Sequence, residues 1–421
     1  MPTESTNSNN NEQAAALQTL LCAVLKSNAF YQPILQQAGL VDTDNITVER
    51  YIQHMPLTTK QQLVDDQREN PPYGSNLSFP IDHYSRFCQT SGTTGKPLRI
   101  IDTAESWQSM LDIWQQVFTH AKCLRGDRVL FAFSFGPFLG FWTAYEAASQ
   151  LGLMCLPAGG TSTGARLAMI ADNAVTTVCC TPTYAMHLAQ AAEQEGIDLA
   201  ASTVKRLIVA GEPGGSIPAI RKRIETAWGA ELYDHHGMTE VGPVTYQDND
   251  APGCLRVASD AFLVEVINPQ TAQPVEPGSE GELVLTTLKR TACPLLRYRT
   301  GDLVKQDPND PMRLIGGILG RIDDMVLIRG VNVYPSAVDA VIRRFDQVAE
   351  YEVIVEQSTA MRELTLRIEP SASCDAASRL CQHIAEAMRD AMSLRVRVDA
   401  VEPGTLAVFE MKANRWREVT R

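Results

Sequence analysis

The chain has 421 residues, 44% apolar and 20% charged, so it is long enough for two or three domains with a sizeable core. Its 37 basic and 49 acidic side chains give a formal charge of −12, which argues against a nucleic-acid-binding surface and against attraction to anionic membranes. No apolar run approaches the length that spans a bilayer, and the ten cysteines include no C-x-x-C pair, which indicates reduced thiols in a cytoplasmic protein.

The amino end, residues 1–12, is rich in Asn, Ser and Thr. It has neither the basic nor the apolar region of a signal peptide, so we expect a disordered tail. Residues 13–37 follow with apolar side chains at helical spacing, which predicts packing helices, and a proline-rich link at 70–74 precedes a loop of distinctive composition.

That loop, residues 89–97, contains two glycines, four hydroxyl side chains and one lysine. Such a loop can turn N–H groups, hydroxyls and a positive charge towards a phosphate. It is not a Walker A loop, because Pro97 follows Lys96 and residues 98–101 have the pattern of a strand. We predict that it joins two strands and closes over a polyphosphate, the alternative being a solvated turn. The candidate phosphate-binding residues are Ser91, Gly92, Thr93, Thr94, Gly95 and Lys96.

A helix is predicted at 105–121, and strands and helices then alternate. Strands are predicted at 128–133, 153–156, 176–180, 204–210 and 231–234, and helices at 138–150, 183–195 and 216–228, the last capped by Ser216. This alternation predicts a parallel sheet with helices on its faces, in which ligands gather at the carboxyl ends of the strands. The candidates at those ends are Gly211, Glu212, Pro213, Asp234, His235, His236, Thr239 and Glu240.

After about Gly253 the pattern changes to strands separated by Pro-Gly turns, which predicts an antiparallel, barrel-like piece. The predicted fold class is therefore α/β, with a large domain at 13–322 and a small α+β domain at 323–421. In the small domain we expect a helix around Val338 and Val341, then strands at 349–356 and 361–368, a helix at 375–390 and a strand at 394–400.

These residue types suit a nucleoside triphosphate. Lys96 can neutralise terminal phosphates, Glu240 can hold Mg²⁺, Asp302 can accept hydrogen bonds from two ribose hydroxyls, and Arg321 can fork onto ribose or phosphate. An isolated carboxylate at a strand end is more often a solvated surface residue, so their order and spacing carry the argument. A zinc site built from the two adjacent histidines and Cys254 is a weaker alternative.

In order and spacing, the chain resembles the adenylate-forming superfamily of acyl-CoA synthetases, peptide-synthetase adenylation domains and luciferases, and most closely its phenylacetate-CoA ligase branch. Five motifs carry the resemblance: Ser-Gly-Thr-Thr-Gly-Lys-Pro at 91–97, Gly-Glu-Pro at 211–213, Asp-His-His-Gly-Met-Thr-Glu-Val-Gly-Pro at 234–243, Arg-Tyr-Arg-Thr-Gly-Asp-Leu at 297–303, and Gly-Arg-Ile-Asp-Asp-Met at 320–325 with Arg-Gly-Val-Asn-Val-Tyr-Pro at 329–335.

The resemblance implies that a carboxylate attacks the α-phosphorus of Mg·ATP to give acyl-AMP and pyrophosphate, and that a thiol, usually coenzyme A, then displaces AMP. It implies that Thr239 contacts the α-phosphate and that Lys412 bridges both anions, which completes a catalytic set of Lys412, Thr239, Glu240 and Lys96, with Glu240 as metal ligand. The small domain would swing about Asp323 and bring the Gly330 loop to the thiol tunnel.

The resemblance also places the acyl pocket at Phe135, Phe138, Ala158, Gly159 and Gly160. The two phenylalanines could pack against an aromatic acid, or equally belong to the core. The expected cofactors are ATP, Mg²⁺ and coenzyme A, and the expected partner is a small carboxylic acid; a homodimer is compatible with the sequence.

The chain departs from the family pattern at several positions. His236 stands where an aromatic residue usually stacks on adenine, Met411 and Ala407 replace a glycine and a proline before Lys412, and Asn414 replaces a basic residue. Two alternatives to a CoA ligase therefore stay open: an adenylating enzyme that passes the acyl group to a carrier protein or an amine, and an inactive nucleotide-binding homologue.

Overall fold

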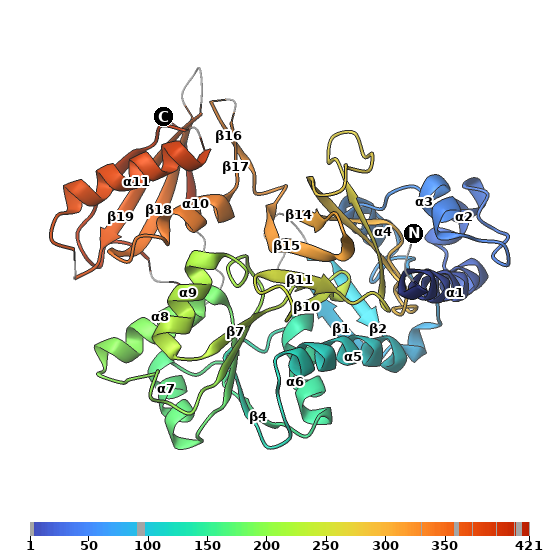
Figure 1. The fold of residues 1–421 in the computed structure, drawn as a ribbon. Helices are drawn as coiled ribbons and strands as arrows, with labels where there is room; N and C mark the ends of the chain where they lie inside the picture. Colours follow the sequence, from blue (N-terminus) through green and yellow to red (C-terminus); the bar gives the residue numbers. More distant parts are fainter. Residues whose placement is uncertain are drawn as a thin grey trace.

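The computed structural model describes residues 4–90, 97–329, 331–357, 362–372, 374–392, 394–407, 409 and 415–420. Two lobes are visible in Figure 1, a large one that contains the amino end and a small one that contains the carboxyl end. The last strand of the large lobe ends at Arg321. No helix among the described residues is long and apolar enough to cross a bilayer.

The amino-terminal helices are α1 (Glu4–Ser27), α2 (Tyr31–Gln37), α3 (Val48–His54) and α4 (Lys60–Glu69), followed by the short 3₁₀ helix η1 (Ile81–His83). Their buried residues pack with Leu263, Leu288 and Leu296 of the antiparallel part of the lobe. Helix α1 begins at Glu4, inside the stretch for which we predicted a disordered tail. Extending a helix from a packed segment such as that around Leu17 and Leu21 is easier than nucleating one, which accounts for the longer helix.

A short antiparallel hairpin, β1 (Arg86–Gln89) and β2 (Arg99–Asp102), follows these helices. Gln89 pairs with Arg99, and Thr90 and Leu98 close the base of the connecting loop by a backbone hydrogen bond of 3.0 Å. The prediction that the hydroxyl-rich segment joins two strands is therefore confirmed. Its residues Ser91, Gly92, Thr93, Thr94, Gly95 and Lys96 lie outside the described part of the chain.

A five-stranded parallel sheet of order β4-β3-β5-β6-β7 forms one part of the large lobe. Its strands are β3 (Arg128–Phe131), β4 (Met154–Pro157), β5 (Thr177–Cys180), β6 (Arg206–Val209) and β7 (Glu231–Asp234). The flanking helices are α5 (Ala104–His120), α6 (Leu139–Gln150), α7 (Thr163–Asp172), α8 (Pro182–Gln194) and α9 (Pro218–Trp228). Helix α7 was not predicted.

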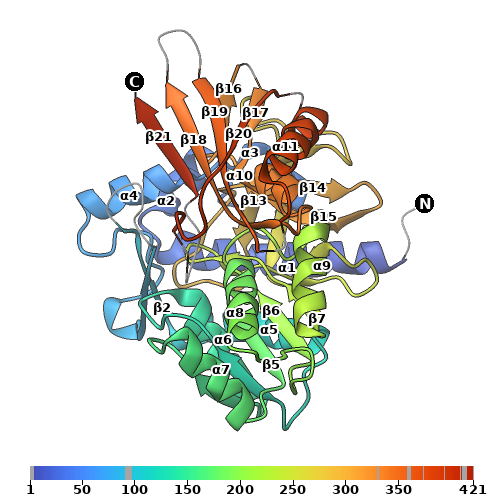
Figure 2. The ribbon, with the colours of Figure 1, turned by 90° about the vertical axis from the view of Figure 1, so that its left-hand side faces the viewer.

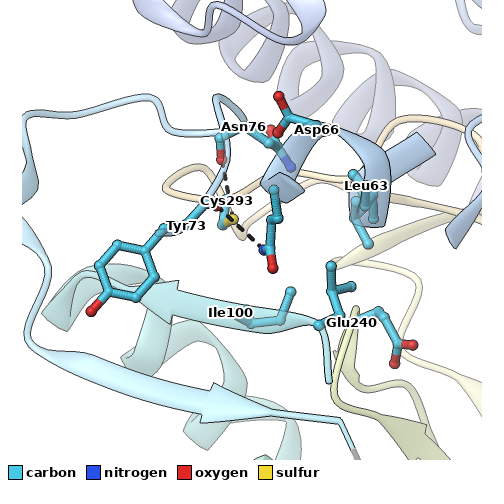
Figure 3. A pocket seen from close by; sticks show the side chains of 10 residues that line it. Leu63, Asp66, Tyr73, Asn76, Ile100, Glu240 and Cys293 are labelled. Atoms are coloured by element: carbon cyan, nitrogen blue, oxygen red, sulfur yellow. Dashed lines mark hydrogen bonds between the residues drawn. The ribbon is translucent and has the colours of Figure 1, made fainter. Parts of the chain in front are cut away.

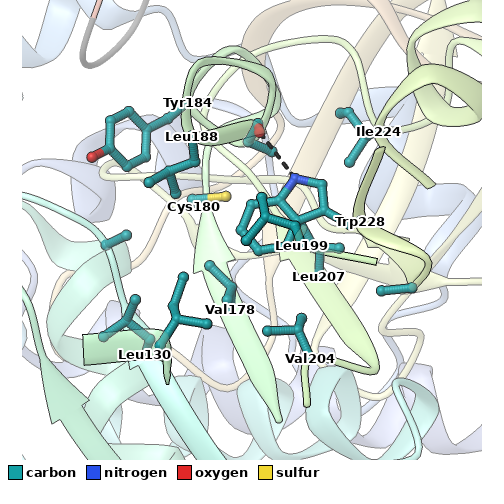
Figure 4. Packing of buried hydrophobic residues seen from close by; sticks show 14 of the residues in the cluster. Leu130, Val178, Cys180, Tyr184, Leu188, Leu199, Val204, Leu207, Ile224 and Trp228 are labelled. Carbon is teal, nitrogen blue, oxygen red and sulfur yellow. Dashed lines mark hydrogen bonds between the residues drawn. The ribbon is translucent and has the colours of Figure 1, made fainter. Parts of the chain in front are cut away.

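Successive strand residues of this sheet face opposite cores. Leu130, Val178 and Leu207 pack against α7, α8 and α9, where the Trp228 indole donates a 3.0 Å hydrogen bond to the Ala185 carbonyl (Figure 4). Their neighbours along the same strands pack with α5 and α6 instead. This two-sided burial is the expected consequence of the βα alternation.

The amino end of α9 differs from the prediction. The helix begins at Pro218, and the Ser216 hydroxyl does not cap it but donates a 2.6 Å hydrogen bond to the Asp234 carboxylate. The N-cap residue is Ile217, so Ser216 lies one residue outside the capping position and its hydroxyl is available to the buried carboxylate.

A six-stranded antiparallel sheet of order β10-β11-β15-β14-β13-β12 forms the rest of the large lobe, as the barrel-like prediction requires. Its strands are β10 (Thr245–Gln247), β11 (Cys254–Val257), β12 (Phe262–Ile267), β13 (Glu280–Thr287), β14 (Tyr298–Asp307) and β15 (Asp310–Arg321). A tight hairpin of β8 (Gly237–Met238) and β9 (Gly242–Pro243) lies between the two large sheets in the chain.

The small lobe contains a four-stranded sheet of order β20-β19-β18-β21 and a two-stranded hairpin. Its elements are β16 (Val326–Ile328), β17 (Val331–Val333), α10 (Pro335–Ile342), β18 (Val348–Gln357), β19 (Arg362–Pro370), α11 (Ala377–Met392), β20 (Arg397–Ala400) and β21 (Trp416–Thr420). Figures 1 and 2 both show this lobe next to α9 of the large lobe, and α10 contacts that helix.

Candidate active site

The predicted nucleotide residues converge where the parallel and antiparallel sheets meet. Strand β7 ends at Asp234, and the chain continues through His236 into the β8–β9 hairpin. On the antiparallel sheet, Asp302 of β14 pairs in register with Arg321 of β15. Residues far apart in the sequence are thereby brought to the carboxyl end of the parallel sheet, where ligands bind in such folds.

Asp302 is 2% exposed, and its two carboxylate oxygens face different partners. Oδ1 accepts a 3.0 Å hydrogen bond from Nη1 of Arg321, and Oδ2 lies 3.1 Å from Nε2 of His236. Burial raises the pKa of this carboxyl, but the imidazole and the guanidinium outweigh burial and hold the pKa below its ordinary value.

The His236–Asp302 contact is close without being a hydrogen bond. Both His236 Nε2 and Asp302 Oδ2 are buried and have no hydrogen-bond partner among the described residues, although they are 3.1 Å apart. A hydrogen bond requires alignment of the donor with the acceptor as well as proximity. Buried polar atoms without partners are costly, and a hydroxylated ligand such as a ribose would satisfy them.

Arg321 connects this site with the expected hinge. Its Nε and Nη2 each lie 2.9 Å from an oxygen of Asp323, and its Nη1 also donates to the Thr300 carbonyl at 3.0 Å. The fork that we expected on ribose or phosphate is therefore made to Asp323 in this structure. One guanidinium thus contacts both Asp302 and the residue at the lobe boundary.

Glu240 lies in the connection between β8 and β9, with its side chain 6% exposed, and lines a small cavity with residues of α4 and β2 (Figure 3). Its carboxylate is 3.0 Å from the ammonium of Lys60, at the start of α4. Mg²⁺ is usually held by one or two carboxylates together with substrate phosphates and water. A single carboxylate that already attracts a cation fits that pattern, and the role of Glu240 as metal ligand stays a prediction.

Arg290 fixes the backbone that carries Thr239 and Glu240. Its guanidinium is 2% exposed, pairs with Asp102 at 2.5 and 2.8 Å, and donates to the carbonyls of Thr239 at 3.3 Å and Glu240 at 2.7 Å. Because Asp102 ends β2, this arginine joins the far end of the strand that follows the 91–96 segment to the Thr-Glu turn. Sequence reasoning identified neither Arg290 nor Lys60, because each belongs to an element remote from the motif it contacts.

Asp234 and His235 have the environment of structural residues. The Asp234 carboxylate accepts from Ser216, and burial raises its pKa to about 6. His235 Nδ1 lies 2.5 Å from the Thr245 carbonyl, its ring is 4.3 Å from that of Trp114, and burial lowers its pKa to about 3. Their cofactor contacts stay predictions. No group of three metal-ligating side chains is found in the part of the chain that the structure describes, so the zinc alternative gains no support there.

The Gly-Glu-Pro segment lies over the start of α8. Gly211 has a φ of +95°, a conformation that favours glycine. The Glu212 carboxylate accepts a 2.7 Å hydrogen bond from the Thr183 N–H, and burial raises its pKa. This bond ties the segment, including Pro213, to the amino end of the helix, where a carboxylate is favourable.

The expected acyl pocket falls in an aromatic cluster at the carboxyl ends of β3 and β4. The ring of Phe135 lies so close to Gly159 that a Cβ added there would be 2.7 Å from it. Phe135 contacts Trp142 and Tyr145 edge-on at centroid distances of 5.1 and 5.7 Å. Neighbouring predicted residues are Phe138, whose ring is 6.1 Å from that of Phe141, Ala158, whose carbonyl accepts from Arg166, and Gly160.

Two further predicted site residues, Gly330 and Lys412, lie outside the described residues, as do Met411 and Asn414. Their roles stay predictions.

Comparison with known proteins gives two family matches, AMP-binding enzyme over residues 16–288 and AMP-binding enzyme C-terminal domain over residues 330–418. The phenylacetate-coenzyme A ligase of Pseudomonas putida is 31% identical over 351 residues, which are 82% of this chain and 77% of that protein. That of Aromatoleum evansii is 34% identical over 325 residues, 75% and 71% of the two chains.

Among solved structures, 2-hydroxyisobutyryl-CoA ligase in the postadenylation state, in complex with 2-HIB-AMP, matches with a TM-score of 0.91 at 26% identity, covering 97% of this chain and 89% of that one. The same enzyme with 2-HIB-AMP and CoA in the thioesterification state gives 0.72 at 27% identity, covering 100% and 91%. Both structures are of one enzyme, so the difference between the two TM-scores reflects how its lobes are arranged. The higher score indicates that the two lobes here are arranged as in the postadenylation structure.

Fold, site and matches together define an AMP-forming acid–thiol ligase. The chain belongs to the AMP-binding enzyme family, and within it to the branch of the phenylacetate-CoA ligases.

Proposed function

We propose that this ligase activates a small aromatic carboxylic acid as its acyl-adenylate, with Mg²⁺ as the metal, and transfers the acyl group to coenzyme A in the cytoplasm. One observation carries the nucleotide part: the buried His236 and Asp302 atoms have no hydrogen-bond partners among the described residues. Glu240, four residues along the chain from His236, has a carboxylate that already pairs with a cation. The aromatic cluster around Phe135 supports the choice of acid, because aromatic rings favour edge-on and offset contacts with one another.

In this mechanism the chain's own residues position two anions that repel each other. Asp302 accepts hydrogen bonds from the ribose, His236 lies against the nucleoside, and Thr239 contacts the α-phosphate. Mg²⁺, held by Glu240, would supply charge neutralisation at the phosphates. Such preorganised charge and alignment are the main sources of rate enhancement in phosphoryl chemistry.

Exchange of labelled pyrophosphate into ATP, measured across a panel of aryl and aliphatic acids, tests the first half-reaction. We expect exchange with at least one aryl acid, and absence of exchange with every acid would contradict the proposal. Mass spectrometry of the products distinguishes acyl-CoA from transfer to a carrier protein or an amine. ATP binding without any turnover would indicate an inactive homologue.

The role proposed for Lys412 has its own test. Lys412→Ala should suppress adenylate formation while sparing thioester formation from supplied acyl-AMP, because the lysine bridges the two anions of the first step only. An equal loss of both half-reactions would refute this role.

A further inference from the structure

Helix α4 contributes a cation to the candidate metal ligand, although no predicted motif lies on this helix. Its amino end is fixed by a capping box, in which Thr59 and Gln62 satisfy each other's backbone N–H groups. One turn further on, the side chain of Gln67 donates to the Arg99 carbonyl at 2.5 Å and accepts from the Arg99 N–H at 3.0 Å. The helix is thus docked on β2, the strand that leaves the phosphate loop, and Lys60 is held next to Glu240.

The two partners of this ion pair differ sharply in freedom. Glu240 is held through its backbone by Arg290, and its side chain is 6% exposed. The Lys60 side chain is 47% exposed, and its ammonium is 3.0 Å from Glu240 Oε1. A buried carboxylate without a counter-charge is costly, whereas a flexible lysine at the protein surface returns to water at little cost.

We propose that Lys60 is the resident counter-cation of Glu240 and that it competes with the divalent metal for this carboxylate when Mg·ATP binds. The inference rests on the proposed function, since it takes Glu240 as the metal ligand. In the ligand-free enzyme the ammonium neutralises the carboxylate and keeps the site from repelling the phosphates. When the metal arrives, the ion pair opens and Lys60 turns to solvent, so part of the metal's binding energy is used to displace it.

Calorimetric titration of ATP without any acid tests this, because no turnover occurs. The dissociation constant is measured once in excess Mg²⁺ and once in EDTA, for the wild type and for Lys60→Gln. We expect Lys60→Gln to bind Mg·ATP about two- to five-fold more tightly, the range expected for a half-exposed ion pair. Metal-free ATP should bind less tightly, because Glu240 is then left uncompensated. The two constants should therefore move in opposite directions.

Three variants serve as controls. Lys60→Arg keeps the charge and should retain the wild-type ratio of the two constants. Arg68→Gln removes an exposed cation from the same helix and should change neither constant. In a Glu240→Gln background, Lys60→Gln should lose its effect on the ratio.

Other outcomes would overturn the inference. If Lys60→Gln weakens ATP binding equally with and without metal, the lysine has a structural or phosphate-binding role. If its effect persists in the Glu240→Gln background, the pair is not the cause. A wild type that binds ATP with a constant independent of Mg²⁺ refutes this inference alone. A wild type that binds no ATP in either condition refutes the proposed function and the inference with it.

Discussion

His235 and His236 are adjacent in the sequence, yet their rings lie in unlike surroundings. The first packs on Trp114 with its pKa lowered by burial to about 3, and the second faces Asp302 in the site. Below about pH 6.5 His235 is protonated in the unfolded chain but stays neutral in the folded chain. Because the unfolded state then binds more protons, the free energy of unfolding falls on acidification. The window of this loss runs from about pH 6.5 down to about pH 3.

We predict that urea unfolding of the wild type loses about 2 kcal/mol through His235 between pH 7 and pH 5. His235→Gln should flatten that part of the curve, and the exposed His383→Gln should leave it unchanged. Parallel curves for the wild type and His235→Gln would show that His235 is not the group that titrates.

Asp302→Asn should weaken ATP binding by about ten- to a hundred-fold, the effect of losing a charged hydrogen-bond acceptor. The reason is that Asn has a single acceptor oxygen and an NH₂ donor, so its two terminal atoms cannot both accept hydrogen bonds from the ribose hydroxyls. The KM for ATP in the exchange reaction measures this, with the exposed Asp260→Asn as control. An unchanged KM would remove Asp302 from the nucleotide site.

The sequence identifies some residues of the candidate site and not others. It identified both Asp302 and Arg321 as candidate site residues from the order of the motifs, but not the ion pair that they form with each other. It did not anticipate Lys60 and Arg290, whose partners come from other elements and meet them only on folding. It singled out His236 for the adenine by resemblance, but it could not show that His235 is buried against Trp114, since burial depends on tertiary packing.

At the scale of elements, the strands and helices of the parallel sheet were predicted because their apolar periods are strong. Strand β7 has the predicted bounds, and α8 (Pro182–Gln194) begins and ends one residue before the predicted 183–195. The misses lie at ends and in short segments: α7 was not found, α1 is longer than predicted, and Ser216 caps nothing. Helix ends depend on a few local contacts, which periodicity does not reveal.

The docking of α4 on β2 gives a prediction at this scale. Gln67→Ala removes both hydrogen bonds to the Arg99 backbone, so we expect a loss of about 1 to 3 kcal/mol in the free energy of unfolding. Amide hydrogen exchange in residues 98–102 should accelerate more than exchange elsewhere. Gln61→Ala, exposed on the same helix, is the matched control. Unaltered exchange in β2 would show that the helix does not hold the strand.

For the whole molecule, the arrangement of the two lobes is the feature that individual motifs do not reveal. The closer match to a postadenylation structure than to a thioesterification structure indicates which arrangement is present. Contacts between the lobes include Ser336 of α10, which donates to the Leu319 carbonyl, and Arg223 of α9, whose two terminal nitrogens each lie 3.5 Å from the Val348 carbonyl. A contact made in one arrangement alone favours the half-reaction that uses that arrangement.

Arg223→Ala should therefore slow adenylate formation by about two- to ten-fold, the effect of one hydrogen bond, while thioester formation from supplied acyl-AMP keeps its rate or increases. Measuring the two half-reactions separately by rapid quench provides the comparison. Lys222→Ala, exposed on the same helix, controls for the loss of charge. If Arg223→Ala slows both half-reactions equally, its side chain supports the fold of α9 and not the orientation of the small lobe. A selective effect would mean that the balance between the two steps is set partly at this contact, away from the nucleotide and the acid.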